Sequence, residues 1–231
     1  MLGPELFGQL GDNSTTNRVT PVAVSGLSSG VVAIVAGYAH DCALTSGGAV
    51  KCWGRNSDGQ VGDNSTTNRL TPVAVSGLSS GVIAITAGGL HTCAVTSGAA
   101  ARCWGDNYSG ALGDNSTTDR WTPVAVSGLS SGVVAIEAGG FHTCAQTSAG
   151  AAKCWGNNGS GRLGNNSTTT SLIPVAVSGL SSGVVAIKVG GYHTCALTSG
   201  GADKCWGYNG YGELGDTTTT DRLTPVSVIG L

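Results

Sequence analysis

Four histidines and eight cysteines recur at a fixed spacing, and they are the residues of this chain best suited to chemistry. The stretch HTCALTSGGADKCWG occupies 193–207, and close copies of it occupy 40–54, 91–105 and 142–156. The residues that recur every 51 positions are His40, His91, His142, His193, Trp53, Trp104, Trp155 and Trp206. Each copy also holds two cysteines with nine residues between them. The chemistries to weigh are a metal site, a redox pair and a structural disulfide.

The histidines fit a structural role better than a metal site. Imidazole is a common metal ligand, and four of them would make a site if they converged on one point. A 51-residue period spreads equivalent atoms around an array instead. We therefore interpret the four histidines and four tryptophans as residues that define the repeat, each histidine forming a hydrogen bond to neighbouring backbone. We expect no metal and no other cofactor.

The cysteine spacing favours a disulfide over zinc or redox chemistry. Zinc sites favour C-x₂₋₄-C spacing, and redox pairs favour C-x-x-C. If Ser-Gly-Gly at 199–201 closes a hairpin, Cys195 faces Cys205 in a pair of strands close enough for a disulfide. Buried free thiols remain the alternative. The same register predicts four bridges: Cys42 to Cys52, Cys93 to Cys103, Cys144 to Cys154 and Cys195 to Cys205.

Four short strands are expected in each period. In the first period they lie at 20–24 (TPVAV), 31–37 (VVAIVAG), 40–45 and 49–54, followed by a polar loop at 55–69. The segment 31–37 is apolar at both alternating sets of positions, so we expect it to be buried on both sides. No stretch sustains the apolar spacing of a helix. Counting five copies of the TPV strand and four of each other strand gives 17, which is four units and one surplus strand.

The sequence therefore predicts an all-β fold, a β-propeller of four-stranded blades built from about four and a half 51-residue repeats. A parallel β-helix is the structural rival, although it would favour shorter coils. We treat 1–231 as a single domain with a partial start at 1–51, full periods at 52–102, 103–153 and 154–204, and a partial end at 205–231. Three ways of closing the array are open: a small closed ring, an oligomer that shares blades, or a piece of a longer array. We favour the last two, because an open monomer would expose apolar faces.

The run GGYHTCALTSGGADKCWGYNGYGELGD at 190–216 resembles the repeat of the regulator of chromosome condensation family. WGRNSDGQVGD at 53–63 resembles that family's Trp-Gly-x-Asn-x-x-Gly-Gln-Leu-Gly motif almost letter for letter. The resemblance covers essentially the whole chain and implies a β-propeller, usually of seven blades. It implies little about function, because this fold serves many. The cysteine pairs depart from the general pattern and suit a bacterial, exported branch, and the chain holds too few units for a seven-bladed ring.

Composition narrows the class of partner. Charged residues make up 10% of the chain, against about 25% in ordinary soluble domains, and the net charge is −2. The basic residues are scattered, which argues against a nucleic-acid partner. No apolar run approaches the roughly 20 residues that span a membrane, and no signal peptide is visible. The cysteine pairs nevertheless suggest an oxidising compartment, so we expect an exported or extracellular bacterial protein.

The repeats vary at a few aligned positions, mainly before each histidine and after each Trp-Gly. A fixed scaffold with variable aromatic and charged residues at one rim is typical of a binding surface. The predicted rim comprises Leu90, Phe141, Tyr192, Arg55, Asp106, Tyr108, Tyr208 and Tyr211. No arrangement of catalytic residues is apparent, so we do not expect an enzyme.

Three functions follow in order of preference. The first is a non-catalytic propeller that binds an unidentified protein through this rim, a function suggested also by a resemblance to propeller-type β-lactamase inhibitors. The second is a purely architectural module of a larger exported protein. The third is a guanine-nucleotide exchange factor, which the absence of a basic patch and the presence of cysteine pairs make the weakest of the three.

Overall fold

The computed structural model describes residues 5–230, and its regular elements are sixteen β-strands. The first sheet contains β1 (Val31–Ala36), β2 (His40–Thr45), β3 (Val50–Gly54) and β4 (Arg69–Ala74). The second contains β5 (Val82–Ala87), β6 (His91–Thr96), β7 (Ala101–Gly105) and β8 (Arg120–Ala125). The third contains β9 (Val133–Ala138), β10 (His142–Thr147), β11 (Ala152–Gly156) and β12 (Ser171–Ala176). The fourth contains β13 (Val184–Val189), β14 (His193–Thr198), β15 (Asp203–Gly207) and β16 (Arg222–Ser227).

Each sheet is an antiparallel blade whose strands pair in chain order. The all-β fold with four-stranded blades confirms the prediction from the sequence. The central hairpin of each blade has the expected register, with Leu197 opposite Asp203 and Ala196 opposite Lys204 in the fourth. A short Ser-Gly-Gly connection therefore sets which side chains face each other along the two middle strands.

The TPV strand occupies a different place from the one expected. It is the last strand of a blade, pairing with the Trp-Gly strand across the long loop, so that Cys52 faces Val73. The predicted strand at 20–24 is not a strand in the structure. The count of 17 was therefore wrong, because the first TPV segment has no Trp-Gly strand before it among the described residues and so lacks a partner to pair with.

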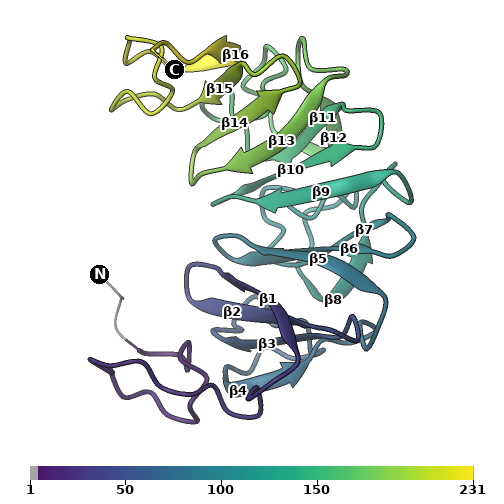
Figure 1. The fold of residues 1–231 in the computed structure, drawn as a ribbon, viewed down its shortest axis with the longest axis vertical. Coiled ribbons are helices and arrows are strands. Elements are labelled where there is room, and N and C mark those ends of the chain that lie inside the picture. Colours follow the sequence, from purple (N-terminus) through teal and green to yellow (C-terminus); the bar gives the residue numbers. More distant parts are fainter. Residues whose placement is uncertain (1–4, 231) are drawn as a thin grey trace.

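The four blades follow one another along an open arc (Figure 1). The first strand of each blade lies against the first strand of the next, in the series β1, β5, β9 and β13. The segment at 5–28 lies beside the first blade at one end of the arc, and the fourth blade lies at the other end. A single copy of the chain therefore does not form the small closed ring that was one of the alternatives.

Apolar side chains are buried between neighbouring blades. Leu44 of the first blade packs with Val82 and Ile85 of the second, and the same cluster contains Trp104. Equivalent clusters fill the next two interfaces. Burial of this kind stabilises by roughly 25 cal/mol per Å² of apolar surface removed from water. Stability thus comes from contacts between successive repeats.

The first strands of the second, third and fourth blades are only partly buried, and β1 has no buried residue, which corrects the expectation that 31–37 is buried on both sides. In the second, third and fourth blades, Val82, Val133 and Val184 are buried, whereas the next residues, Ile83, Val134 and Val185, are 49–56% exposed. The strand lies along the inner side of the arc, so alternate side chains face the open space there. An apolar residue at both sets of positions does not require burial at both.

A buried asparagine holds each long loop. Asn107 Nδ2 donates to Asp114 Oδ1, Ser116 O and Thr118 O at 3.0–3.1 Å, and its Oδ1 accepts from Leu112 N at 3.0 Å. Asn56, Asn158 and Asn209 make the equivalent bonds. The loop so shaped reaches the next blade, where Asn115 N donates to Leu172 O at 3.0 Å. Residues 5–230 contain no helix that is long and apolar enough to cross a membrane.

Candidate protein-binding rim

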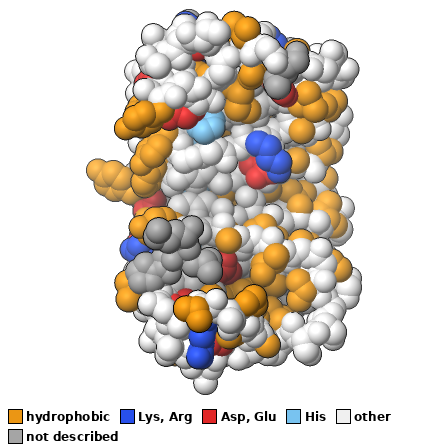
Figure 2. Space-filling view, turned by 60° about the vertical axis from the view of Figure 1, so that its left-hand side comes forward, with side chains coloured by type: hydrophobic (Ala, Val, Ile, Leu, Met, Phe, Trp, Pro, Cys, Tyr) orange, Lys and Arg blue, Asp and Glu red, His pale blue; other side chains and the backbone are white. Residues whose placement is uncertain are grey.

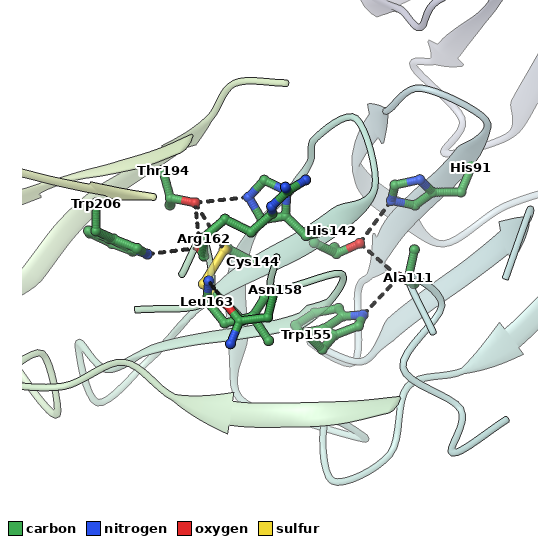
Figure 3. The surroundings of a disulfide bond; sticks show 12 residues. His91, Ala111, His142, Cys144, Trp155, Asn158, Arg162, Leu163, Thr194 and Trp206 are labelled. Carbon is green, nitrogen blue, oxygen red and sulfur yellow. Dashed lines mark hydrogen bonds between the residues drawn. A yellow bond between two sulfur atoms is a disulfide. The ribbon is translucent and has the colours of Figure 1, made fainter. Parts of the chain in front are cut away.

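A chain of hydrogen bonds joins each blade to the next. His142 Nε2 lies 2.9 Å from Thr194 Oγ1, and Thr194 Oγ1 donates to Arg162 O at 3.1 Å. Trp206 Nε1 donates to the same carbonyl at 2.9 Å (Figure 3). His91, Thr143, Trp155 and the Ala111 carbonyl repeat the arrangement one blade earlier. The histidine and tryptophan therefore connect blades, and the partner of the histidine is a threonine hydroxyl of the next blade, not the backbone expected from the sequence.

Burial keeps these histidines uncharged. His40 and His91 are 1% exposed, and desolvation lowers the pKa of His40 to about 3 and that of His91 to about 4. Burial, with the nearby Arg162 guanidinium, also lowers the pKa of His142. A neutral imidazole can form a hydrogen bond with a threonine hydroxyl in a buried interface between blades, which is a structural role. The three side chains bond to three different blades, an arrangement without the convergence that a metal site needs.

All four predicted disulfides are present. They join Cys42 to Cys52, Cys93 to Cys103, Cys144 to Cys154, and Cys195 to Cys205, each with the two Cα atoms 4.1 Å apart. In every blade the paired cysteines face each other across the central hairpin. No described cysteine is left free. The bridges confirm the hairpin argument, since register alone brings the two sulfur atoms together.

The two variable positions of each repeat are neighbours in space. The residue after Trp-Gly donates its backbone N–H to the carbonyl of the residue before the histidine. In the fourth blade Tyr208 N donates to Tyr192 O at 3.0 Å, and in the second Asp106 N donates to Leu90 O at 2.9 Å. Gly207 makes this turn possible with a φ of 102°, and a Cβ there would lie 2.8 Å from Tyr192 O. Each blade thus presents both variable side chains at one spot.

Four predicted rim residues form a continuous series of rings, which we call the aromatic ladder: Phe141, Tyr192, Tyr208 and Tyr211. Successive ring centroids lie 6.1, 6.2 and 6.2 Å apart, with tilted or edge-on geometry that aromatic pairs favour. Phe141 and Tyr192 are 40% and 50% exposed, and Tyr211 is 88% exposed. The ladder therefore presents a broad aromatic surface that runs from the third blade to the end of the fourth.

Arg162 lies behind the ladder and is absent from the rim predicted from sequence. Its guanidinium carbon is 5.0 Å from the centre of the Tyr192 ring, and the residue is only 5% exposed. Its Nε and Nη1 are buried with no hydrogen-bond partner. Burial lowers the pKa of Arg162. Variation at the aligned positions Gln60, Ala111 and Glu213 was the only signal in the sequence, and it gave no indication of a contact with Tyr192.

The other predicted rim residues lie outside the ladder. Arg55 contacts Ser57 and Asp58 and stands over the Phe7 ring at 5.9 Å. Asp106 is half-buried, and desolvation raises its pKa. Tyr108 is 84% exposed and has no ring contact among the described residues, whereas Leu90 is half-buried. The face drawn in Figure 2 carries separate groups of hydrophobic side chains with few charges between them.

Comparison with known proteins agrees with this architecture. The chain is 33% identical to the Ultraviolet-B receptor UVR8 of Arabidopsis thaliana over 226 residues, 96% of this chain and 51% of that protein. It is 35% identical to the Probable E3 ubiquitin-protein ligase HERC4 of Homo sapiens over 87% of this chain and 19% of that protein. The chain therefore spans about half of the first relative and a fifth of the second.

Solved structures show the same arrangement of blades. The structure of human WBSCR16 superposes with a TM-score of 0.85 and 25% identity, covering 97% of this chain and 61% of that one. Prp20p from Saccharomyces cerevisiae superposes with a TM-score of 0.81 over 97% of this chain and 56% of that one, at 19% identity, and shows the fold alone.

The matching family profile is the Regulator of chromosome condensation (RCC1) repeat. One profile of that description covers residues 48–95, 103–146 and 153–197, and a second covers 31–60, 82–111, 133–162 and 184–213. With its repeated Trp-Gly loops and four-stranded blades, this chain belongs to the RCC1 repeat family.

Proposed function

We propose that this protein is a non-catalytic interaction propeller that binds a protein partner through the aromatic ladder. The observation that carries the proposal is the ladder itself, four rings in series over a buried arginine on a chain with only 5% aromatic residues. Tyrosine, tryptophan and arginine supply most of the contact energy in protein interfaces. Rings held by one another also lose little conformational freedom on binding.

Relatives support the same class of function. The solved structures of yeast RCC1 (Prp20) describe a complex with Kap60 and binding to Gsp1p and histones. Those partners belong to that protein. They show that propellers of this fold bind other proteins, and this chain offers a candidate surface of its own. The four disulfides support an oxidising, extracellular setting for that interaction.

The ladder proposal is tested by substituting Tyr192, Tyr208 and Tyr211 together by alanine. Proteins captured from the source by the wild type would be purified, and their affinity measured for both forms by calorimetry. We expect the triple variant to bind at least tenfold more weakly, a loss of about 1.4 kcal/mol. Ile83→Ala with Val185→Ala is the matched control, since it removes exposed apolar surface on the inner side of the arc. Equal affinity for all three proteins would overturn the proposal and favour an architectural module.

A further inference from the structure

A cavity of about 470 Å³ lies against the first blade, far along the arc from the aromatic ladder. It is enclosed by the segment at 5–18 on one side and by the end of β1 and the start of β2 on the other. Its lining includes two carboxyl groups, Glu5 and Asp41, and the ring of Tyr38. No role in the aromatic ladder or in the joints between blades accounts for these three side chains.

All three residues depart from the repeat. Asp41 stands where the other blades have Thr92, Thr143 and Thr194, and Tyr38 stands where they have Gly89, Gly140 and Gly191. Glu5 takes the position of the buried loop asparagine, represented by Asn56 in the next repeat. Asp41 and Tyr38 replace residues that are identical in the other three copies, whereas Glu5 lies in a segment, 1–7, that barely matches the repeat. Asp41 and Tyr38 therefore mark a local specialisation, and Glu5 lines the same cavity.

Each carboxyl group stands where the other repeats have a residue with hydrogen bonds of its own. Asp41 replaces a threonine that is hydrogen-bonded to an imidazole, and Glu5 replaces an asparagine that donates hydrogen bonds. At the inner joints, the threonine that corresponds to Asp41 receives the imidazole of the preceding blade at 2.8–2.9 Å. At the inner loops, the asparagine that corresponds to Glu5 donates through its Nδ2. Among residues 5–230, no side chain donates to the Asp41 carboxyl. Glu5 is 4% exposed. Its Oε2 accepts from Leu10 N at 3.1 Å, as the oxygen of the loop asparagine does in the other repeats, whereas its Oε1 is buried without a hydrogen-bond partner.

Within the part of the chain that the structure describes, no positive charge neutralises this pair. Arg18 lines the cavity, but its Nε and Nη2 lie 2.8 and 2.7 Å from Asp12 Oδ2. His40 also lines it, and burial keeps that imidazole neutral. Burial and the nearby charge of Glu5 raise the pKa of Asp41 to about 7, as expected for carboxyl groups that share a partly desolvated site without a cation.

We propose that this cavity binds a protonated nitrogen base about the size of an imidazolium ring. Asp41 and Glu5 accept its N–H hydrogen bonds, and Tyr38, which is 82% exposed, offers an aromatic surface to the cation at the edge of the cavity. The size of the ligand is inferred from the position of Asp41. At the equivalent position of the second, third and fourth blades, the threonine contacts the imidazole ring of the preceding blade. The base is either a free small molecule or a protein side chain.

A second copy of this chain does not fit this cavity as its occupant. His193 is the histidine at the far end of the arc, and its blade would also bring the loop at 208–221 against Trp53. The place of that loop is already taken, because Trp53 Nε1 donates to Gln9 O at 2.7 Å. This bond matches the one from Trp104 Nε1 to Gln60 O at 2.9 Å. The segment at 5–28 would have to leave, and Glu5 would leave with it.

The experiment titrates the whole chain with imidazole and with pyrazole at pH 6.5, following the chemical shifts of the Tyr38 and Asp41 amides by NMR. The two rings are alike in size, but pyrazole stays neutral. We expect imidazole to bind with a dissociation constant on the order of 1 mM, and pyrazole at least tenfold more weakly. A capped Gly-His-Gly peptide distinguishes the sources: tighter binding than imidazole indicates a side chain, and weaker binding indicates a free base.

Two variants make the test specific. Asp41→Thr and Tyr38→Gly restore the residues of the other blades, so both should fold, and thermal unfolding would check this. We expect Asp41→Thr to lose imidazole binding at least tenfold and Tyr38→Gly to weaken it severalfold, whereas Asp221→Asn, at an exposed position in the fourth blade, leaves it unchanged. Equal binding of imidazole and pyrazole, or undiminished binding by Asp41→Thr, would overturn the proposal. A ladder variant keeps this site, so the two proposals fail independently.

Discussion

His91 Nε2 lies 2.8 Å from Thr143 Oγ1, 52 residues further along the chain and in the next blade. Both side chains are fully buried, and Thr143 Oγ1 donates a hydrogen bond to the Ala111 carbonyl at 2.8 Å. This contact joins the second blade to the third. It is made between side chains whose separation in sequence is one repeat plus one residue.

Thr143→Val should therefore loosen that joint. Valine has nearly the same shape, but it leaves the His91 ring nitrogen without its partner in a buried place. We expect a loss of about 1–3 kcal/mol in the free energy of unfolding, measured by urea denaturation. Thr117→Val, on an exposed part of a loop, is the matched control and should change stability by less than about 0.5 kcal/mol. A wild-type midpoint for Thr143→Val would mean that the hydroxyl contributes nothing to the joint.

Acid should weaken the array through its buried histidines. Their pKa values are lowered in the folded protein, to about 3 for His40 and about 4 for His91, so below the ordinary value of 6.5 the unfolded chain binds more protons. Stability contributed by each histidine is complete above pH 6.5 and falls by up to about 1.4 kcal/mol per pH unit below it. Urea midpoints between pH 4.5 and 8 measure this slope. His91→Gln should make it shallower, and an unchanged slope would exclude His91 as a source.

Asp41 should act in the opposite direction. Its pKa is raised from 3.8 to about 7, so the folded protein holds the proton more tightly, and stability falls as the pH rises from about 4 to 7. We expect Asp41→Thr to be more stable than the wild type by about 1–3 kcal/mol at pH 8, a range reduced for partial exposure, and by much less at pH 4. Thermal unfolding of both proteins at the two pH values checks this. A difference that does not change with pH would contradict the shifted pKa.

Each disulfide should stabilise one blade. Replacing Cys93 and Cys103 together by alanine removes a link between residues ten apart in sequence. The chain-entropy estimate for so short a loop is about 2–3 kcal/mol. Thermal unfolding with and without reductant measures it. The double variant should respond less to reductant than the wild type, since it has one bridge fewer to lose, and an equal response would mean that this bridge contributes nothing.

Within a blade, the sequence was nearly sufficient. The hairpin from His193 to Gly207 has the predicted register, and Cys195 meets Cys205 as expected. The prediction succeeded because the two strands are joined by a loop of three residues, so counting outward from the turn fixes every opposing pair. The variable residues Tyr192 and Tyr208 were predicted to share a rim, and they are backbone neighbours, although their role in binding remains a proposal.

Beyond the hairpin, counting fails. The TPV strand is separated from its neighbour by a loop of fourteen residues between Gly54 and Arg69, and two pairings, before or after that loop, fit its sequence equally well. Only burial of the loop asparagine and contact with the next blade decide between them. Arg162 behind Tyr192 was missed for a similar reason, because the two residues belong to successive repeats.

The sequence by itself determined the repeat, the all-β blades and the four disulfides, because each rests on spacing within one 51-residue unit. The tertiary structure decided which strand closes each blade, how histidine and threonine join neighbouring blades, and which rings meet in the aromatic ladder. It also brought Glu5 and Asp41 to one cavity. Those relationships depend on the orientation of one repeat relative to the next. That orientation is set by side chains packed across the interface between blades, so the sequence of a single repeat does not determine it.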